Sequence, residues 1–457
     1  MIKNKVPLDV LKNDKAVRKE IENEFQQLIH SVNHLSRDGV ESPFTNVSVF
    51  DKHKLRYIIK EHLLWMFSDG GVVDIEECVD YVFELQEIFL DIFDKGDPSN
   101  NGMPYRFPVC TMNISKIKNG DDYILADEES LEIFLNRDIS RYNIFTSEST
   151  KIASCCRLIN DEEMLDVAST SNSFGAGVLS SIGSHRVVTL NFNKMALEAE
   201  SIDDFWKIYT YRVEAAKDIL IAHKVLIHVL EQIGLQPFIT RGWIDLNRLF
   251  STFGILGLYE CEKVLKQRFG VEGDLKKKIL TFLNRKARLY TKKNAGYVFN
   301  IEQIPAESMA VKVCSADRII HGDTFIEYPL YANQFVPLWE EASLWDRLRI
   351  DGEYTKILTG GGIAHATVGQ RLTREQAKKI ICFALSCGCE HFAINTVYSE
   401  CINSHVSMGS FSTCPICSED ISTQLTRVVG FFTPVKAWNK TRREFDFPQR
   451  KFVDKSI

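Results

Sequence analysis

The sequence contains no long hydrophobic run: nowhere do about 18 apolar residues follow one another, as a membrane-spanning helix requires. The N-terminal stretch MIKNKVPLDVLKNDKAVRKEIENEF is charged and has the pattern of a helix, which is not typical of a secretory signal peptide. We therefore expect a cytoplasmic protein that has no membrane partner.

An excess of one charge is also missing. The chain carries 55 Lys and Arg residues against 61 Asp and Glu residues, a net charge of −6, with both signs mixed along its length. A protein that follows the nucleic-acid backbone needs a basic surface, so nucleic acid is not an expected partner. Internal repeats and low-complexity linkers are absent as well. With 457 residues, 45% of them hydrophobic, the chain can bury a large core.

The chain has 12 cysteines. In a reducing cytoplasm, cysteines serve as metal ligands, catalytic thiols or core residues rather than in disulfides. Four of them lie in stretches with apolar periodicity and are expected to fill the core. These are Cys78, Cys261, Cys314 and Cys382.

Helical patterns alternate with short β-rich runs, which favours an α/β fold. Helices are predicted over 8–35, over 55–93 as a pair, and over 202–233; strands are predicted over 44–50, 107–114, 186–192, 298–303, 356–358 and 392–397. Beyond residue 398 the helical periodicity stops, and Cys, Ser, Pro and Gly become frequent. We therefore divide the chain into a catalytic domain, 1–397, and a small module packed on it, 398–457.

The module carries a candidate metal site. Cys414 and Cys417 form a C-P-x-C pair, which is typical of a metal knuckle, and Cys401 and His405 precede it closely. Thiolate and imidazole ligands at this spacing suit tetrahedral zinc, and a shell made only of protein ligands makes the metal structural. His405 competes for the fourth position with two other cysteines, Cys387 and Cys389.

Gly430 follows this module within the run RVVGFFTP. A lone glycine between β-branched and aromatic residues is ordinarily a buried tight turn. The alternative is a glycine that carries a backbone radical, which is delocalised between the adjoining nitrogen and carbonyl. Val429, Phe431 and Phe432 would shield such a radical from solvent and oxygen.

A radical of this kind needs a partner thiol, and Cys155 and Cys156 lie far upstream in the run ASCCRL. Two adjacent cysteines taken alone are most simply core residues. Paired with Gly430, Cys156 is a candidate for a thiyl radical on a loop, and Cys155 for an accessory thiol.

These motifs resemble the anaerobic (class III, glycyl-radical) ribonucleoside-triphosphate reductases. The tail RVVGFFTPVKAWNKTRREFDFPQRKF is similar to the glycyl-radical segment of that family. Similar segments follow in the family's order along most of the chain: SVNHLSRDGVESPFTN at 31–46, FPVCTMNI at 107–114, SCCRL at 154–158, SIGSHRVVTLN at 181–191, FSTFGILGLYE at 250–260, FNIEQIPAESMAVK at 299–312, NQFVPLWEEASLWDRL at 333–348 and GCEHFAINTVYSEC at 388–401.

The resemblance implies a ten-stranded α/β barrel of the glycyl-radical enzyme type, with a finger loop that carries the thiyl cysteine and a second loop that brings the radical glycine beside it. By the same resemblance Gly430 is the radical glycine, Cys156 is the thiyl residue and the zinc module anchors the glycine loop. A radical-SAM activase would oxidise Gly430. Ribonucleoside triphosphates would then be reduced for DNA synthesis at the expense of formate or a thiol system, in an anaerobe or in a host cell if the gene is viral.

The segment EQIPAES has two interpretations. Pro305 suits the first turn of a helix, and Ala306, Glu307 and Ser308 would then lie at its start. A helix N-terminus can bind substrate phosphates through its backbone N–H groups. An ordinary capped helix explains the same residues equally well.

The chain also departs from the family. The SPFTN segment already begins at residue 42, so the family's nucleotide-sensing domain, its first barrel strands and the cysteine that faces the thiyl residue have no counterpart. Cys110 is not an obvious replacement for that cysteine. The N-terminal strands are thus expected to come from a separately encoded fragment, and the whole to form a homodimer. The alternatives are a pyruvate formate-lyase type of enzyme, which the adjacent cysteines suggest, and an inactive truncated paralogue that only binds a partner subunit.

Overall fold

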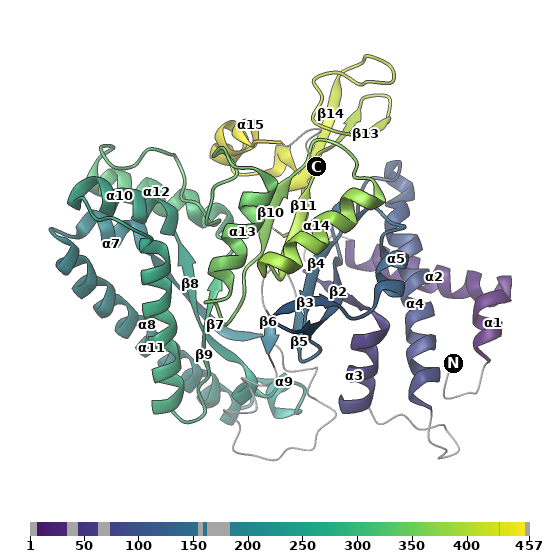
Figure 1. The fold of residues 1–457 in the computed structure, drawn as a ribbon, viewed down its shortest axis with the longest axis horizontal. Coiled ribbons are helices and arrows are strands. Elements are labelled where there is room, and N and C mark those ends of the chain that lie inside the picture. Colours follow the sequence, from purple (N-terminus) through teal and green to yellow (C-terminus); the bar gives the residue numbers. More distant parts are fainter. Residues whose placement is uncertain are drawn as a thin grey trace.

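The computed structural model describes residues 7–33, 44–62, 74–153, 159–161, 183–428 and 430–452. Helices and strands alternate along most of the chain, which confirms the α/β class (Figure 1). Within the described residues, no helix is both long and apolar enough to cross a membrane.

The helices precede, connect and follow the strands in the order that Figure 1 colours. The helices are α1 (Leu8–Asn13), α2 (Lys15–Asn33), α3 (Lys52–His62), α4 (Ile75–Lys95), α5 (Glu128–Phe134), α7 (Phe192–Glu198), α8 (Ile202–Gln232), α9 (Pro237–Thr240), α10 (Leu258–Phe269), α11 (Leu275–Lys293), α12 (Glu307–His321), α13 (Leu344–Thr355), α14 (Arg374–Cys387) and α15 (Phe447–Gln449).

The strands fall into a main sheet, a second parallel sheet and two antiparallel sheets. They are β1 (Asn46–Phe50), β2 (Val109–Asn119), β3 (Asp122–Leu125), β4 (Asn143–Ser147), β5 (Lys151–Ala153), β6 (Ile159–Asp161), β7 (Ser184–Asn191), β8 (Phe250–Leu256), β9 (Phe299–Gln303), β10 (Ala364–Thr367), β11 (His391–Asn395), β12 (Tyr398–Cys401), β13 (Val406–Met408), β14 (Ile421–Arg427) and β15 (Phe432–Pro434).

The main sheet and the second parallel sheet run on from one another. One has the order β1-β2-β4-β11-β10, with β3 paired to β2, and the other has the order β7-β8-β9. A parallel bridge between Glu302 of β9 and Gly361, just before β10, joins them. Every pair along this path is parallel except β4 with β11, which is antiparallel. Two groups of parallel strands therefore meet at β4 and β11, near the middle of Figure 1.

Each group of strands packs one apolar face against helices. On β2, Cys110, Met112 and Ile114 belong to a core shared with α4 and α14, and on β9, Phe299 and Ile301 belong to a second core shared with α8 and α11. Because side chains alternate along a strand, the residues between them point to the opposite face of the sheet. The helices thus cover one face only.

The two outer edges of this strand path differ. At β1, the side-chain amide of Gln86 donates to the backbone oxygen of Phe50 and accepts from its N–H, both at 2.9 Å. At β7, no strand among the described residues pairs with the outer edge. The described strands do not close on themselves, so the ten-stranded barrel remains a prediction.

Sequence periodicity located several of these elements. The helix predicted over 202–233 is confirmed as α8, and the strands predicted over 298–303 and 392–397 are confirmed as β9 and β11. The helix predicted over 8–35 is two helices, because Asp14 has extended backbone and its carboxylate caps α2.

Two sequence predictions are wrong. Residues 356–358 are not a strand, since Ile357 and Leu358 form the turn that ends α13, and the neighbouring strand is β10 instead. Cys382 is exposed on α14 rather than buried in the core, whereas Cys78, Cys261 and Cys314 are buried as expected. Cys382 stands in a run of apolar residues on α14 in which Ile381 and Ala384 are buried, so the run alone does not show which of its members face the core.

The C-terminal segment forms its own antiparallel sheet in the order β13-β12-β14-β15. This sheet projects beyond the end of β11 (Figure 1). It follows β11 after Asn395 with only two residues between them, so β12 extends directly from the main sheet. The division of the chain into 1–397 and 398–457 stays a prediction.

Candidate active site and metal centre

Gly430 lies in the loop of a β-hairpin. Strands β14 and β15 pair with Arg427 opposite Phe432, so residues 428–431 form the connection. Gly430 itself is buried. The expected burial of Gly430 is therefore present.

Aromatic side chains surround this loop. The Phe431 ring stacks on Phe107 with ring centroids 5.4 Å apart and meets the edge of Phe44 at 5.7 Å. Phe432 instead packs against Tyr398 within the module, at 5.8 Å. Of the three residues expected to shield the glycine, these two lie in apolar surroundings, and Val429 lies outside the described residues.

A buried arginine fastens the hairpin to the main sheet. The guanidinium of Arg427 donates to the backbone oxygens of Ser140, at 2.6 Å, and of Ile394 in β11, at 3.1 Å. Its charge lies over the Phe432 ring, 4.1 Å from the centroid. The hairpin loop is thereby held at the carboxyl end of β11.

A second arginine closes the hairpin from the C-terminal side. Arg450 donates to the backbone oxygens of Arg427, at 2.6 Å, and of Val428, at 3.4 Å. Asp446 holds Arg450 and also pairs with Arg442, at 2.9 Å and 2.7 Å, and all three are buried. Burial alone would raise the pKa of the Asp446 carboxyl, but Arg450 and Arg442 lower it below its usual value.

Cys155 and Cys156 lie outside the described residues, so their distance from Gly430 is not part of this structure. The strand that leads toward them is anchored. The N–H of Ala153, the last residue of β5, donates to Asn113 Oδ1 at 3.3 Å, and its carbonyl accepts from Ser48 at 2.9 Å. The end of β5 therefore lies on the face of the sheet that carries Asn113.

The face of the sheet opposite the helices is also buried, and its residues are polar. Sequence reasoning missed this feature. On β2, β9, β10 and β11, the residues that alternate with the apolar core are polar and at most 9% exposed. They are Thr111, Asn113, Ser115, Asn300, Glu302, His365, Thr367, His391 and Asn395. Buried polar side chains in such number need partners or a polar ligand. The signal was present in the sequence as alternation inside TMNIS, FNIE, AHAT and HFAIN.

Some of these polar residues bond to one another across strands. His365 Nδ1 lies 3.2 Å from Asn395 Oδ1, and Thr252 donates to Asn300 Oδ1 at 2.6 Å. Asn395 ends β11, the strand to which Arg427 fastens the glycine hairpin. The hairpin and the polar face therefore meet at one end of the sheet.

The four predicted metal ligands do come together. Cys401 Sγ lies 3.7 Å from Cys417 Sγ and 3.6 Å from His405 Nδ1, and Cys414 Sγ lies 3.9 Å from the same nitrogen. All four ligand atoms lie within 4.8 Å of one another. A tetrahedral zinc with thiolate bonds of about 2.3 Å requires sulfur atoms about 3.8 Å apart. The cluster therefore fits a tetrahedral metal ion such as zinc.

Backbone N–H groups support the thiolates of this cluster. The N–H of Ile416 points to Cys414 Sγ and that of His405 to Cys401 Sγ, both at 3.4 Å. Burial alone would raise the pKa of the Cys414 thiol, but the backbone N–H groups of Cys417 and Ile416 lower it to about 6. Thiolate is the form that binds a metal. Cys387 and Cys389, the competing candidates, instead point to backbone oxygens, of Leu348 and of His391.

The helix predicted in EQIPAES is present, but it begins after Pro305. Helix α12 starts at Glu307, so Pro305 precedes it rather than forming its first turn. Ala306 is the N-cap, with a φ of 60°, and no side chain caps the helix. The Glu307 carbonyl accepts from Arg442 at 3.0 Å. The start of α12 is thereby linked to the same ion cluster that holds the glycine hairpin.

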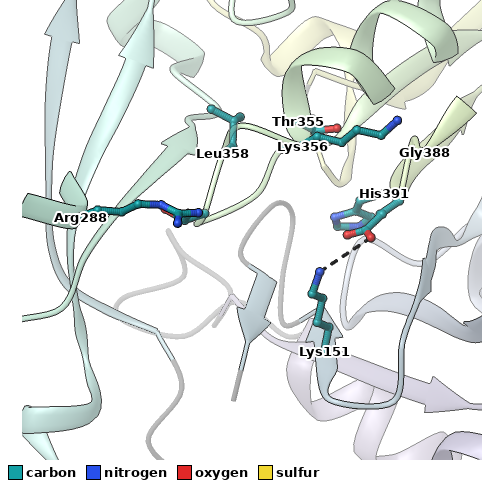
Figure 2. Close-up of a pocket in the computed structure, with 10 residues that line it drawn as sticks. Lys151, Arg288, Thr355, Lys356, Leu358, Gly388 and His391 are labelled. Carbon is teal, nitrogen blue, oxygen red and sulfur yellow. Dashed lines mark ion pairs between the residues drawn. The ribbon is translucent and has the colours of Figure 1, made fainter. Parts of the chain in front are cut away.

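A separate cavity of about 300 Å³ lies at the other end of β11 (Figure 2). Lys151, Arg288, Lys356 and His391 line it, and Lys151 forms an ion pair with Glu390 at 3.9 Å. Because His391 begins β11 whereas Arg427 fastens the hairpin near its end, this cavity is distinct from the surroundings of Gly430.

The sequence matches the family described as "Anaerobic ribonucleoside-triphosphate reductase" over residues 8–452. The chain belongs to this family. No curated protein sequence matches it. The family and the related structures identify it as an oxidoreductase of the ribonucleotide reductase type.

Solved structures of anaerobic ribonucleotide reductases are similar to nearly all of this chain. One matches 98% of this chain and 70% of its own, with 25% identity and a TM-score of 0.79. The enzyme from Thermotoga maritima with glycerol in the active site matches 96% and 69%, with 26% identity and a TM-score of 0.77. The same enzyme in complex with dATP and CTP matches 97% and 70%, with 27% identity and a TM-score of 0.77.

The ion cluster around Asp446 predicts a stability effect. Arg450→Met in the reductase chain removes one charge partner of a buried carboxylate and the donor to two hairpin carbonyls. We expect it to lower the free energy of unfolding by about 3–5 kcal/mol and to speed amide exchange in β14 and β15. Lys436→Met, at an exposed position beside the hairpin, is the control and should change stability by less than about 0.5 kcal/mol. Equal effects of the two substitutions in denaturant titrations would contradict the assigned role.

The metal cluster predicts a metal content. Purified wild-type protein should carry about one zinc per chain, and the double variant Cys414→Ser/Cys417→Ser should carry almost none. Cys387→Ser is the matched control, because this cysteine lies outside the cluster, and it should keep its zinc. Elemental analysis of the three proteins decides the matter: full zinc in the double variant would disprove the site.

Proposed function

We propose that the chain reduces ribonucleoside triphosphates to 2′-deoxyribonucleoside triphosphates by glycyl and thiyl radical chemistry, for DNA synthesis without oxygen. The observation that carries this proposal is Gly430, buried in a clamped hairpin loop beside a buried polar face. A radical on this glycine is stabilised by delocalisation over the adjoining amide groups, and the surrounding rings exclude water and oxygen.

In this proposal the radical passes from residue to residue, and to the substrate, by transfer of hydrogen atoms. A radical-SAM activase removes a hydrogen atom from the α-carbon of Gly430, and Gly430 regains one from the Cys156 thiol. The thiyl radical then takes the ribose 3′-hydrogen, and the 2′-hydroxyl leaves with a proton as water. Formate or a thiol system supplies two electrons, which with one proton place a hydrogen on the 2′-carbon where the hydroxyl was lost. Cys156 returns its hydrogen to the 3′-carbon, and the thiyl radical that this leaves takes a hydrogen atom from Gly430 and so restores the glycyl radical. Cys155 is a candidate accessory thiol for the step in which the substrate is reduced.

The start of α12 is proposed to hold the substrate phosphates. Ala306, Glu307 and Ser308 form a helix N-terminus with no side-chain cap, and such an end directs backbone N–H groups at an anion. The link from Glu307 through Arg442 to Asp446 connects this end with the glycine hairpin. The solved relative with dATP and CTP supports nucleotides as the class of ligand.

Zinc at Cys401, His405, Cys414 and Cys417 is proposed to be structural. With four protein ligands it has no open position for substrate. Its part is to hold the turns of the hairpin sheet, so that β14 presents Gly430 in a fixed position. We also propose that the protein acts in the cytoplasm of an anaerobe, or of a host cell if the gene is viral.

The remaining proposals concern assembly. Solved relatives are matched over 69–70% of their chains, and β7 lacks an outer partner strand among the described residues. A ten-stranded barrel, completed by a separately encoded N-terminal fragment and paired as a homodimer, accounts for both. The four-ligand cluster and the nucleotide-bound relatives favour this reading over a pyruvate formate-lyase type of enzyme, and the preserved Gly430 surroundings favour it over an inactive paralogue.

The radical assignment predicts that substitutions of Gly430 and of Cys156 have different effects. After anaerobic treatment with the activase and a reductant, the assembly should give the doublet electron-resonance signal of one α-hydrogen. Gly430→Ala should lose the signal and the activity together, because a side chain hinders a planar radical. Cys156→Ser should keep the signal and lose nucleotide reduction, because a hydroxyl holds its hydrogen too strongly.

Oxygen gives an independent check on the same residue. It should cleave the activated backbone at Gly430, and the shortened chain should be visible on a gel. A doublet in the Gly430→Ala protein, or nucleotide reduction by the Cys156→Ser protein, would show that the roles are assigned wrongly. Acyl transfer without nucleotide reduction would favour the lyase alternative.

The assembly proposal predicts that the chain alone does not behave as a complete enzyme. Its open strand edge and apolar surface favour aggregation. Co-expression with the upstream-encoded fragment should yield a soluble and active assembly, as measured by size-exclusion chromatography and by nucleotide reduction. An isolated chain that is monodisperse and fully active would refute the split enzyme.

A further inference from the structure

The cavity where β11 begins carries charged residues that have no part in the proposed reaction. Arg288 of α11, Lys356 at the end of α13 and Lys151 of β5 line it, together with His391. Figure 2 shows that these side chains lie on different sides of the cavity. Three cations from three elements that are distant in sequence thus surround one volume of about 300 Å³. A cavity lined by one sign of charge in this way attracts ions of the opposite sign.

The cavity has little negative charge of its own. Among the described residues that line it, Glu390 is the only one with a carboxylate. The ammonium of Lys116 donates to that carboxylate at 2.7 Å, and Lys116 is buried. The ammonium of Lys151 lies farther from the carboxylate, at 3.9 Å. Lys116 therefore offsets the charge of Glu390, and the described lining offers no second carboxylate.

Arg288 and Lys356 form no hydrogen bond or ion pair within the part of the chain that the structure describes. Both side chains are exposed, so a ligand can reach them from solvent. The stem of Lys356 is also packed, because it lies over Gly388, where an added Cβ would clash with Lys356 Cε. The glycine that follows α14 thus leaves the room that Lys356 occupies.

Two helix ends oppose the positive charge in part. Helix α13 ends at Thr355 and α14 at Cys387, so the carboxyl ends of both helices lie beside the cavity residues Lys356 and Gly388. A helix carboxyl end carries about half a negative charge, so the two ends together offset about one of the three positive charges. About two positive charges remain, which matches a small anion with two or more negative charges.

The hydrogen-bond donors of the cavity favour a phosphate group. The guanidinium of Arg288 presents its N–H groups in one plane, a geometry that suits phosphate oxygens. The Thr359 hydroxyl accepts from the N–H of Ile301 at 3.3 Å, and no described bond uses its own hydrogen. The described lining includes one large aliphatic side chain, Leu358, and no aromatic ring besides that of His391. Charge and donors therefore dominate the cavity, rather than an apolar surface.

We propose that this cavity binds a small phosphate anion such as diphosphate, either free or as the phosphate tail of a nucleotide. Arg288, Lys356 and Lys151 are its charged contacts, and Thr359 donates a hydrogen bond. The inference goes beyond the proposed function, which assigns the substrate phosphates to the start of α12. None of residues 306–308, which form that helix start, lines this cavity.

Lysine labelling of the purified full chain locates the anion. Saturating inorganic diphosphate should slow the acylation of Lys356 at least about tenfold, because only the small unbound fraction of the chain reacts. Lys379, exposed on α14 and outside the cavity, is the internal control and should react at an unchanged rate. Equal rates of Lys356 with and without diphosphate, equal slowing of the two lysines, or the same slowing of Lys356 by sodium chloride at equal ionic strength would overturn the inference.

Substitution tests the contacts by titration calorimetry with diphosphate. Arg288→Met should weaken binding at least about tenfold, because a hydrogen bond between two charged groups is lost. The Arg288 side chain is exposed, so the folded chain accommodates the change. Arg285→Met is the matched control, since Arg285 is exposed on the same helix but does not line the cavity. Equal affinities of the two variants for diphosphate would exclude Arg288 as a contact and overturn the inference.

Two further ligands identify the source of the phosphate group, and only binding that Arg288→Met weakens is counted. Equal or weaker binding of ATP than of diphosphate would assign the site to free phosphate anions. Tighter binding of ATP would assign it to the phosphate tail of a nucleotide. Binding of adenosine as tight as that of diphosphate would overturn the inference, because adenosine carries no negative charge.

None of these measurements requires the radical, so they separate this inference from the proposed function. A chain that binds diphosphate through Arg288 but reduces no nucleotide after activation would sustain the phosphate cavity and reject the function. Nucleotide reduction by a chain in which diphosphate does not protect Lys356 would do the reverse.

Discussion

The rest of the structure depends on strands that are apolar on one face and polar on the other. Helices cover the apolar face, through Met112 on β2 and Ile301 on β9, for example. This burial contributes most of the favourable free energy. The opposite face is also removed from water, yet it carries residues such as Asn113, His365 and Asn395. An ordinary core would not tolerate them, because a buried polar group without a partner costs free energy.

The contacts of the C-terminal module have a different effect, which is to fix the short loop between β14 and β15. Arg427 and Arg450 bring two charges into the interior, and the desolvation of such groups is costly. The cost is offset because each guanidinium meets backbone carbonyls, and Asp446 neutralises Arg450. These contacts act at Arg427 and Val428, where the loop begins. A loop tied at its base in this way has little freedom, as a site that must place one atom accurately requires.

Sequence reasoning performed well where the signal is local. The metal cluster follows from the C-P-x-C pair and its near neighbours, because ligands close in sequence are close in space. Helix α8 follows from a long apolar period. Reasoning failed where position depends on tertiary packing: Pro305 stands before α12 rather than inside it, and residues 356–358 end a helix instead of forming a strand. The polar face was missed because four short alternations, each weak alone, gain meaning only once the strands lie side by side.

The glycine hairpin and the start of α12 are also coupled, through the carboxylate of Asp446. Asp446 pairs with Arg450, which bonds the hairpin, and with Arg442, which bonds the carbonyl of Glu307 at the start of α12. A shift of the hairpin therefore moves Arg450 relative to Asp446 and disturbs Arg442 in turn. Since buried ion pairs lose much of their stabilisation when their geometry changes, the hairpin and the helix start are constrained to move together. The positions of Gly430 and of the proposed phosphate site therefore depend on each other. The Asp446 carboxylate links them although it contacts neither.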